Sequence, residues 1–247
     1  MLYSKNNIMD LSVILPCYNE NKNIEGIINQ LTNLNFRNIK YEIIFVDNGS
    51  TDNSFKNFHI HQKKFNLGII KVVKIKKNLG YGNGIIRGIK QANGKIISWT
   101  HADLQTDIHD IFEGYYKLIS YSSNDKVILK GKRINRNFVD SFFTYCMSIY
   151  VKIFLNINIE DINAQPKMFY KSFLPNFENP PNDFSLDLFF LILAKKNKYK
   201  IIEQNVYFKT RKYGIAKGGG NLYGKIKLII RTIKYINLLK NNKKLWK

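Results

Sequence analysis

Two acids, an amide and an imidazole follow a short apolar run in the stretch SWTHADLQTD, residues 98–107. Asp103 and Gln105 alternate, so both side chains face the same side of an extended chain. Hard cations such as Mg²⁺ and Mn²⁺ take oxygen ligands and usually bind through few protein carboxylates together with substrate phosphates. The pattern therefore indicates a cation site that serves a phosphate-bearing ligand. The alternative is an ordinary polar turn, in which Asp103 caps a helix near Ile108 and His101 has only local partners.

Two other polar clusters, PCYNE (16–20) and VDNGSTD (46–52), each follow an apolar run. Pro16 ends the first run because it has no N–H to donate to a strand ladder, and Tyr18 and Glu20 then extend beyond it. Asp47 closes the second run, where its carboxylate could accept hydrogen bonds from a nucleobase or ribose. Taken alone, either cluster is equally typical of a turn with a helix cap.

A glycine-rich segment, NLGYGNGIIRG, begins at Asn78 and includes Gly82. Glycines at this density allow the backbone to approach a diphosphate closely. The segment is not a dinucleotide-binding fingerprint, because it does not follow the first strand, and it lacks the Lys-Ser/Thr pair of a P-loop.

The elements that must position these residues alternate between strand and helix. Apolar runs predict strands at 11–16, 41–48, 69–75, 95–103 and 126–133, and helical spacing predicts helices at 21–35 and 80–92. Alternation of this kind predicts a mostly parallel sheet with helices on both faces. Ligands in such sheets bind beyond the carboxyl ends of the strands, so we expect one cleft to gather the polar clusters.

From about residue 136 the pattern changes. An aromatic-rich helix (138–157), a proline-rich loop, a helix (185–196), a strand (200–208) and a terminal helix (222–240) are expected. We predict a domain over 1–217, with a nucleotide-binding half of about 8–135 and an acceptor-side half of about 136–217. A basic amphipathic tail over 218–247 would follow.

The net charge of the 247-residue chain is +21, with 45% hydrophobic residues and two cysteines. The hydrophobic content excludes global disorder, and the cysteine count indicates a reducing compartment. The charge implies an anionic partner, although general lysine enrichment is the alternative. We see no signal peptide and no motif for binding nucleic acid. The run 142–157 is short for a bilayer span and contains Lys152, so no membrane span is expected.

The order of the four motifs resembles that of the family 2 glycosyltransferases with the Rossmann-like GT-A fold, and most of all the dolichyl- and polyprenyl-phosphate sugar transferases. The likeness continues downstream in GKR (131–133), DINAQPKMF (161–169) and RKYGIAK (211–217) and covers about residues 11–217. It implies an enzyme that moves a sugar, with inversion, from a UDP- or GDP-sugar to a polyprenyl phosphate. Such an enzyme would serve cell envelope biogenesis.

The resemblance also implies roles for individual residues. The nucleotide side would include Pro16, Tyr18, Glu20, Asp47, Asn78 and Gly82. Asp103 and Gln105, with His101 beside them, would hold the Mg²⁺ or Mn²⁺ and the donor diphosphate. Arg211 and Lys217 would reach phosphate, and Arg133 and Gln165 would line the acceptor side.

The sequence departs from the family pattern at two positions. His101 stands where the family usually has the first acid of its metal motif, and Ala216 stands where it usually has serine. The loss of one negative charge should weaken the binding of Mg²⁺ or Mn²⁺, because imidazole suits softer metals. Arg133, Arg211 and Lys217 would then neutralise more of the diphosphate. The same departure motivates an alternative, a degenerate homologue that binds a nucleotide without catalysis.

The acceptor decides which further groups are needed. A lipid phosphate is already an anion and needs no general base, whereas a glycan hydroxyl in surface polysaccharide synthesis would need one, with Asp161 or Asp187 as candidates. A lipid acceptor would give the helices at 138–157 and 222–240 a place on the anionic cytoplasmic face of the membrane; packing against the domain is the alternative. Because many relatives carry transmembrane helices beyond this point, we expect a peripheral protein or one that relies on a membrane-protein partner.

Overall fold

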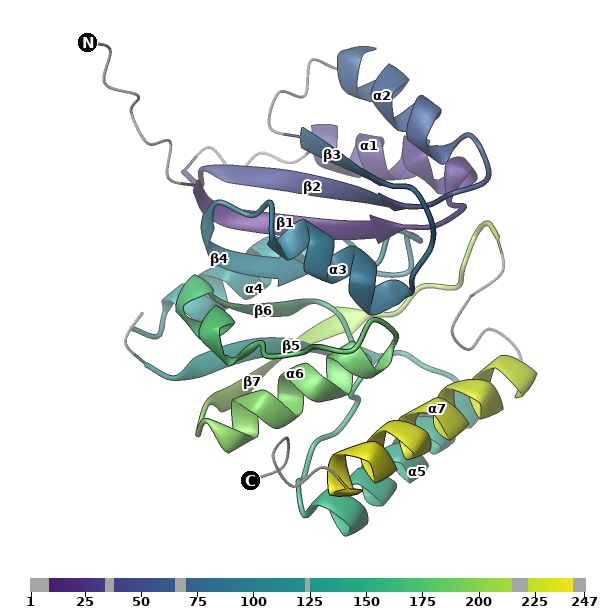
Figure 1. Ribbon diagram of the computed structural model, residues 1–247. Coiled ribbons are helices and arrows are strands. Elements are labelled where there is room, and N and C mark those ends of the chain that lie inside the picture. Colours follow the sequence, from purple (N-terminus) through teal and green to yellow (C-terminus); the bar gives the residue numbers. More distant parts are fainter. Residues whose placement is uncertain (1–8, 34–37, 65–69, 123–124, 215–221, 242–247) are drawn as a thin grey trace.

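The chain forms a seven-stranded mixed sheet covered by helices on both faces, as seen in a computed structural model (Figure 1) that describes residues 9–33, 38–64, 70–122, 125–214 and 222–241. The strands are β1 (Met9–Cys17), β2 (Tyr41–Asn48), β3 (Ile70–Ile75), β4 (Gly94–Trp99), β5 (Val127–Ile134), β6 (Lys167–Tyr170) and β7 (Lys200–Tyr207). The helices are α1 (Ile24–Thr32), α2 (Ser54–Lys64), α3 (Tyr81–Ile89), α4 (His109–Ile119), α5 (Phe138–Leu155), α6 (Ser185–Lys196) and α7 (Leu222–Asn241).

The sheet order is β3-β2-β1-β4-β6-β5-β7. All neighbouring strands are parallel except β6, which runs antiparallel to both β4 and β5. The predicted α/β fold with a mostly parallel sheet is confirmed. The sequence analysis did not predict β6, because this strand has only four residues and begins with a lysine, Lys167, so it shows no apolar run.

Strand alternation divides the core into two layers. In β1, Leu11, Val13 and Leu15 pack with α1, α2 and α4, whereas Ile14 belongs to a second cluster that includes side chains of α3, α5, α6 and α7. Successive strand residues point to opposite faces, so a parallel sheet buried on both sides needs apolar residues at nearly every position. One sheet thus joins the predicted nucleotide and acceptor halves, and the predicted boundary at 217/218 lies outside the described residues.

Helices α5 and α7 lie side by side at one end of the molecule (Figure 1). Val151 and Leu155 of α5 and Ile236 and Leu239 of α7 are buried in the second core layer. Other apolar side chains of α5 are exposed at helical spacing, namely Phe138, Phe142, Tyr145, Ile149 and Ile153. On α7, Tyr223, Ile226, Ile230 and Leu238 are exposed as well. The two helices therefore pack on the domain and still present apolar surface.

By length and composition alone, α5 is apolar enough to cross a membrane, with a mean hydropathy of 1.4 over 18 residues of which 17% are buried. The sequence analysis set this segment aside because of its length and because of Lys152. The observed helix packs along α7 and carries Asp140 in its first turn. Length and hydropathy therefore do not distinguish a span from a helix that lies on a surface.

Candidate active site

Residues from the carboxyl ends of several strands line one cavity of about 1160 Å³. The predicted site residues on its wall are Pro16, Tyr18, Glu20, Asn78, His101, Asp103, Gln105, Arg133 and Arg211. The cavity continues to side chains of α5 and α7, among them Phe143, Met147, Leu228 and Ile229. The sheet topology thus brings together residues almost 200 positions apart, and one continuous space connects the polar strand ends to an apolar helix pair.

Arg211 ties the two acidic clusters of the cavity together. Its guanidinium donates to Asp103 Oδ2 at 3.1 Å and also bonds Glu20, while its Nε donates to the carbonyl of Tyr213 at 2.8 Å. Burial raises the pKa of Glu20, and the bonds from Arg211 act in the opposite direction. Arg211 is the cation that pairs with both Glu20 and Asp103, so a donor diphosphate would compete with these two carboxylates for it.

The segment around Lys209 is attached to the loop that follows β4. Lys209 N donates to the carbonyl of Gln105 at 2.8 Å, Gln105 Nε2 donates back to the carbonyl of Lys209 at 3.2 Å, and Lys209 Nζ pairs with Asp107 at 3.0 Å. These three contacts hold Arg211 over Asp103. Residues 211–214, the described part of the motif RKYGIAK, are therefore positioned by the loop that carries the predicted metal ligands.

Asp110, in the first turn of α4, gives a prediction about pH. Burial raises its pKa from 3.8 to about 6, with Asp107 and Glu113 adding repulsion. The folded protein then binds more protons than the unfolded chain between pH 4 and pH 6, so this group lowers stability as pH rises through that window. We expect Asp110→Asn to gain stability relative to wild type between pH 4 and pH 7 in thermal melts. A constant difference in Tm across that range would contradict this assignment.

His101 lies half-buried between Tyr81 and Asp103. Its ring centroid is 5.5 Å from that of Tyr81, and Tyr81 in turn stacks on Phe184 at 4.5 Å. Burial lowers the pKa of His101, opposed by the nearby carboxylates of Asp103 and Asp187. A neutral imidazole at this position can accept a proton or a metal ion.

The donor atoms around Asp103 fit a divalent cation only in part. Within the described residues no three His, Cys, Asp or Glu side chains gather as a metal site. Asp103 Oδ1 accepts from the backbone N–H of Gln105 at 3.1 Å, and its other oxygen accepts from Arg211. One carboxylate, one amide oxygen and one imidazole can hold Mn²⁺ when diphosphate oxygens complete the set, and they suit Mg²⁺ less well. Such a cation, when bound, would offset charge that grows on the leaving diphosphate.

The glycine-rich turn packs against protein backbone. Gly80 has φ of +112°, and a Cβ there would lie 2.3 Å from the carbonyl oxygen of Asn182. A Cβ at Gly82 would lie 2.4 Å from the carbonyl oxygen of Pro181. The proline-rich loop therefore packs beside both glycines, and Gly80 lines the cavity while Gly82 does not. Contact between this segment and a diphosphate stays a prediction.

Asp47 is also set back from the cavity wall. Its side chain is 1% exposed; Oδ1 accepts from Ser50 N at 3.1 Å, and Oδ2 has no hydrogen-bond partner within the described part of the chain. Its neighbour Asn48 lines the cavity and donates to Asn78 Oδ1 at 3.3 Å and to the carbonyl of Gly80 at 2.8 Å. Contact between Asp47 and a nucleobase stays a prediction, and Asn48 is a wall residue that sequence reasoning did not select.

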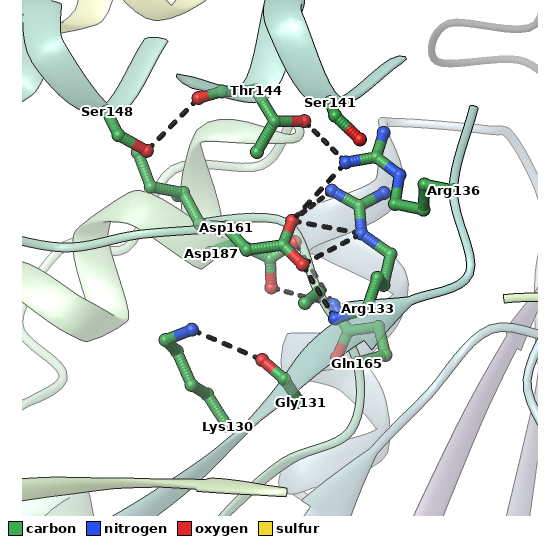
Figure 2. A network of polar contacts seen from close by, with 12 residues as sticks. Lys130, Gly131, Arg133, Arg136, Ser141, Thr144, Ser148, Asp161, Gln165 and Asp187 are labelled. Atoms are coloured by element: carbon green, nitrogen blue, oxygen red, sulfur yellow. Dashed lines mark hydrogen bonds and ion pairs between the residues drawn. The ribbon is translucent and has the colours of Figure 1, made fainter. Parts of the chain in front are cut away.

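On the acceptor side, Arg133 is held by Asp161, as Figure 2 shows. Arg133 Nε lies 3.0 and 3.2 Å from the two carboxylate oxygens, its NH2 bonds the same group, and its backbone N–H donates at 2.8 Å. Burial alone would raise the pKa of Asp161, but the Arg133 guanidinium beside it lowers the pKa below the usual range. Asp161 is therefore an anion that fixes Arg133 at the cavity wall.

Gln165 and Asp187 belong to a buried network next to this pair (Figure 2). Gln165 Nε2 donates to Asp187 Oδ1 and to Tyr81 Oη, both at 3.0 Å, and Trp99 Nε1 donates to Asp187 at 3.2 Å. Lys167 lies 3.7 Å from Asp187. Gln165 thus lies behind the cavity wall. Lys167 and Trp99 are members of this network that the sequence analysis did not select. Lys217, the other predicted phosphate-binding residue, lies outside the described residues.

A mostly parallel sheet with a cavity at the carboxyl ends of its strands is the arrangement found in the GT-A fold. The family model described as Glycosyl transferase family 2 matches residues 12–159. The chain belongs to this family.

Curated relatives include polyprenyl-phosphate sugar transferases. The chain is 27% identical over 92% of its length to a dolichol-phosphate mannosyltransferase of Pyrococcus furiosus, covering 64% of that protein. It is 28% identical over 64% of its length to a dolichyl-phosphate beta-glucosyltransferase of Dictyostelium discoideum, covering 53% of it. The chain therefore spans about half to two thirds of the length of these relatives.

Solved structures share the fold. Glucosyl-3-phosphoglycerate synthase from Mycobacterium tuberculosis, in complex with Mn²⁺, UDP and glucosyl-3-phosphoglycerate, superposes with a TM-score of 0.69 at 16% identity, covering 94% of this chain and 79% of that one. A mannosyltransferase from Pyrobaculum calidifontis with GDP-mannose and Mn²⁺ gives 0.63 at 17% identity, covering 83% and 58%. At these identities the comparison supports the GT-A fold, and those neighbours bind Mn²⁺ with UDP or a GDP-sugar.

Proposed function

We propose that this protein is a glycosyltransferase that moves a sugar from a UDP- or GDP-sugar to a polyprenyl phosphate and inverts the anomeric carbon. The observation that carries the proposal is the state of the cavity acids. Each carboxylate on the described wall is ion paired: Glu20 and Asp103 with Arg211, Asp140 with Lys225, Asp183 with Arg231, and Asp187 with Lys167. A carboxylate held by a cation is a weaker base. The site thus suits a nucleophile that is already an anion.

A glycan acceptor fits this arrangement less well. Its hydroxyl would have to lose a proton, and Asp161 and Asp187, the two bases considered from sequence, are both committed. Asp161 is bound to Arg133, and Asp187 accepts hydrogen bonds from Trp99 and Gln165. The relatives that act on dolichyl and undecaprenyl phosphates support the same choice of acceptor.

The shape of the cavity supports a lipid. Arg133 and Arg136 line the same cavity as the polar strand ends and the apolar side chains of Phe143, Met147 and Leu228. A phosphate at the guanidinium groups would lie next to the donor site, while its hydrocarbon chain could lie against α5 and α7. Charge attracts the phosphate, and apolar burial would hold the chain.

The direct test is transfer from radiolabelled UDP- and GDP-sugars to a polyprenyl phosphate and to oligosaccharides, each with and without Mn²⁺. Label in the lipid phase, linked through an acid-labile phosphodiester, is the expected result. Transfer to oligosaccharide alone would overturn the choice of acceptor. Calorimetric titration with UDP and GDP identifies the donor class, and folded protein that binds neither would favour a non-catalytic homologue.

We also propose that the protein works on an anionic membrane surface, with exposed side chains of α5 and α7 in the interface. Phe138 and Phe142 of α5 are 84% and 53% exposed, and Lys227 and Lys234 of α7 are exposed as well. Buried aromatic rings and lysines near anionic lipid each contribute favourably, at about 1 kcal/mol per lysine.

Flotation with vesicles that contain anionic phospholipid tests the membrane proposal. We expect wild type to float at low salt, less at high salt, and Phe138→Asp/Phe142→Asp to float at least about tenfold less, because each buried ring contributes about 1.5–3 kcal/mol. Ile60→Asp on α2, where Ile60 is 50% exposed, is the matched control and should float like wild type. Wild type that stays with the soluble fraction at low salt would end the proposal.

A further inference from the structure

Arg136 is a second arginine on the acceptor side, next to Arg133. Arg136 follows β5 and lines the cavity, and its side chain is 11% exposed. Its NH1 donates to Thr144 Oγ1 of α5 at 2.6 Å and lies 3.9 Å from Asp161 Oδ1. Figure 2 shows the guanidinium groups of Arg133 and Arg136 converging on the one carboxylate of Asp161.

The positive charge of Arg136 is poorly compensated. Asp161 is occupied by Arg133 through its guanidinium and its backbone N–H. Asp140, the other nearby acid, pairs with Lys225 and accepts from Asn137. The Nε of Arg136 is buried and has no hydrogen-bond partner among the described residues. Burial, together with repulsion from Arg133, lowers the pKa of Arg136. A buried guanidinium has five N–H donors, and those of Arg136 are largely unused here.

The position of Arg136 suits an anion that enters from the helix side. The cavity that Arg136 lines also carries Asp103 and Gln105, where the donor diphosphate is expected. Phe143, Met147 and Ile229 of α5 and α7 line the same cavity, and Arg136 is bonded to α5 through Thr144. A phosphate monoester with an apolar tail is the ligand that would meet a guanidinium first and an apolar wall behind it.

We propose that Arg136, assisted by Thr144, binds the phosphate of the acceptor and aligns one of its oxygens with the anomeric carbon of the donor. This inference rests on the proposed function. Arginine recognises phosphate through two parallel N–H donors, and the Thr144 hydroxyl can donate to a phosphate oxygen while it accepts from Arg136. In the transfer step the phosphate oxygen forms a bond to the anomeric carbon. The bond from that carbon to the diphosphate oxygen breaks, its electron pair leaves with the nucleoside diphosphate, and no proton moves.

The test compares Arg136→Gln, Arg136→Lys and the control Lys132→Gln in the full chain. Lys132 pairs with Glu203 at 3.3 Å, is 44% exposed and does not line the cavity. Lys132→Gln therefore removes one positive charge, as Arg136→Gln does, but away from the cavity. Binding of a short-chain prenyl monophosphate and of the nucleotide is measured by calorimetry, with inorganic phosphate as a second probe. Transfer kinetics give KM for the acceptor and kcat.

We expect Arg136→Gln to weaken prenyl phosphate binding and raise the acceptor KM by about 10- to 100-fold, the range for lost hydrogen bonds to a charged group. Nucleotide affinity should stay within about twofold, and Arg136→Lys should recover part of the loss. Weak binding of inorganic phosphate that also depends on Arg136 would separate the phosphate contact from the contribution of the chain.

Other outcomes overturn the inference or the function separately. Transfer to polyprenyl phosphate with an unchanged acceptor KM in Arg136→Gln would refute the role of Arg136 and leave the proposed function standing. Equal losses of nucleotide and acceptor binding, with a lower Tm, would make Arg136 only a tether between β5 and α5. Prenyl phosphate that binds through Arg136 but receives no sugar would keep the anion site and refute the proposed function.

Discussion

Asp103→Asn is expected to lower the rate of sugar transfer by about 10²- to 10³-fold, the range observed when one preorganised electrostatic group is removed from a transition state. Asp103 is the carboxylate that the end of β4 places between Gln105 and Arg211. Its loss would remove the one carboxylate among the predicted metal ligands Asp103, Gln105 and His101. It would also remove one of the two carboxylates that pair with Arg211. Asparagine keeps the shape and an acceptor oxygen, so the fold should persist.

Two measurements separate these effects. Calorimetric titration with nucleotide in the presence and absence of Mn²⁺ should lose its metal dependence in Asp103→Asn, while transfer assays report the rate. Asp125→Asn is the matched control, because it removes the same charge at an exposed position that does not line the cavity. Nucleotide binding in Asp103→Asn that keeps the full response to Mn²⁺ would show that Asp103 is not a metal ligand.

Lys167→Met is expected to destabilise the protein by about 3–5 kcal/mol, the usual cost of breaking a buried ion pair by removing one partner. Lys167 is 0% exposed, donates to the carbonyls of Ile162 and Ala164, and lies 3.7 Å from Asp187. Burial lowers its pKa from 10.5 to about 8. Methionine would fill the volume but leave the carboxylate and both carbonyls without this donor.

Urea unfolding followed by circular dichroism measures the loss, and a double-mutant cycle assigns it. Lys167→Met combined with Asp187→Asn should be less destabilised than the sum of the single variants, by about 1–3 kcal/mol, because the unpaired charge is gone. Lys132→Met, at a 44% exposed ion pair, should cost less than about 1 kcal/mol. Additive single effects would mean that Lys167 stabilises only the backbone carbonyls.

Most elements of the fold were predictable because their sequence patterns are local. The helix predicted at 185–196 is α6 at the same bounds, and the strand predicted at 200–208 is β7, Lys200–Tyr207. The helix predicted from 21 begins as a 3-10 turn, Asn21–Asn23, before α1. Strand β6 was not predicted, because its lysine is stabilised by carbonyls and an acid that only the folded chain brings near.

The terminal helix illustrates the same limit. An arc of Leu222, Ile226, Ile229, Ile230 and Ile233 was read from its spacing, yet Ile226 and Ile230 are 44% and 47% exposed, while Ile236 and Leu239 are buried. Helical periodicity identifies an apolar arc, but which part of a wide arc meets the domain depends on how the helix is rotated against α5 and α6.

Sequence by itself determined that polar clusters follow the carboxyl ends of parallel strands and that their order resembles that of a glycosyltransferase. Both could be predicted because strand runs, turn residues and motif spacing are properties of neighbouring residues. Only the tertiary structure decided which charges meet. Arg211 reaches Glu20 from 191 positions away, and Asp161 lies against Arg133 and not free as a base. Ion pairing depends on distances across the fold, and these distances decide whether a carboxylate is a base, a metal ligand or the fixed partner of an arginine.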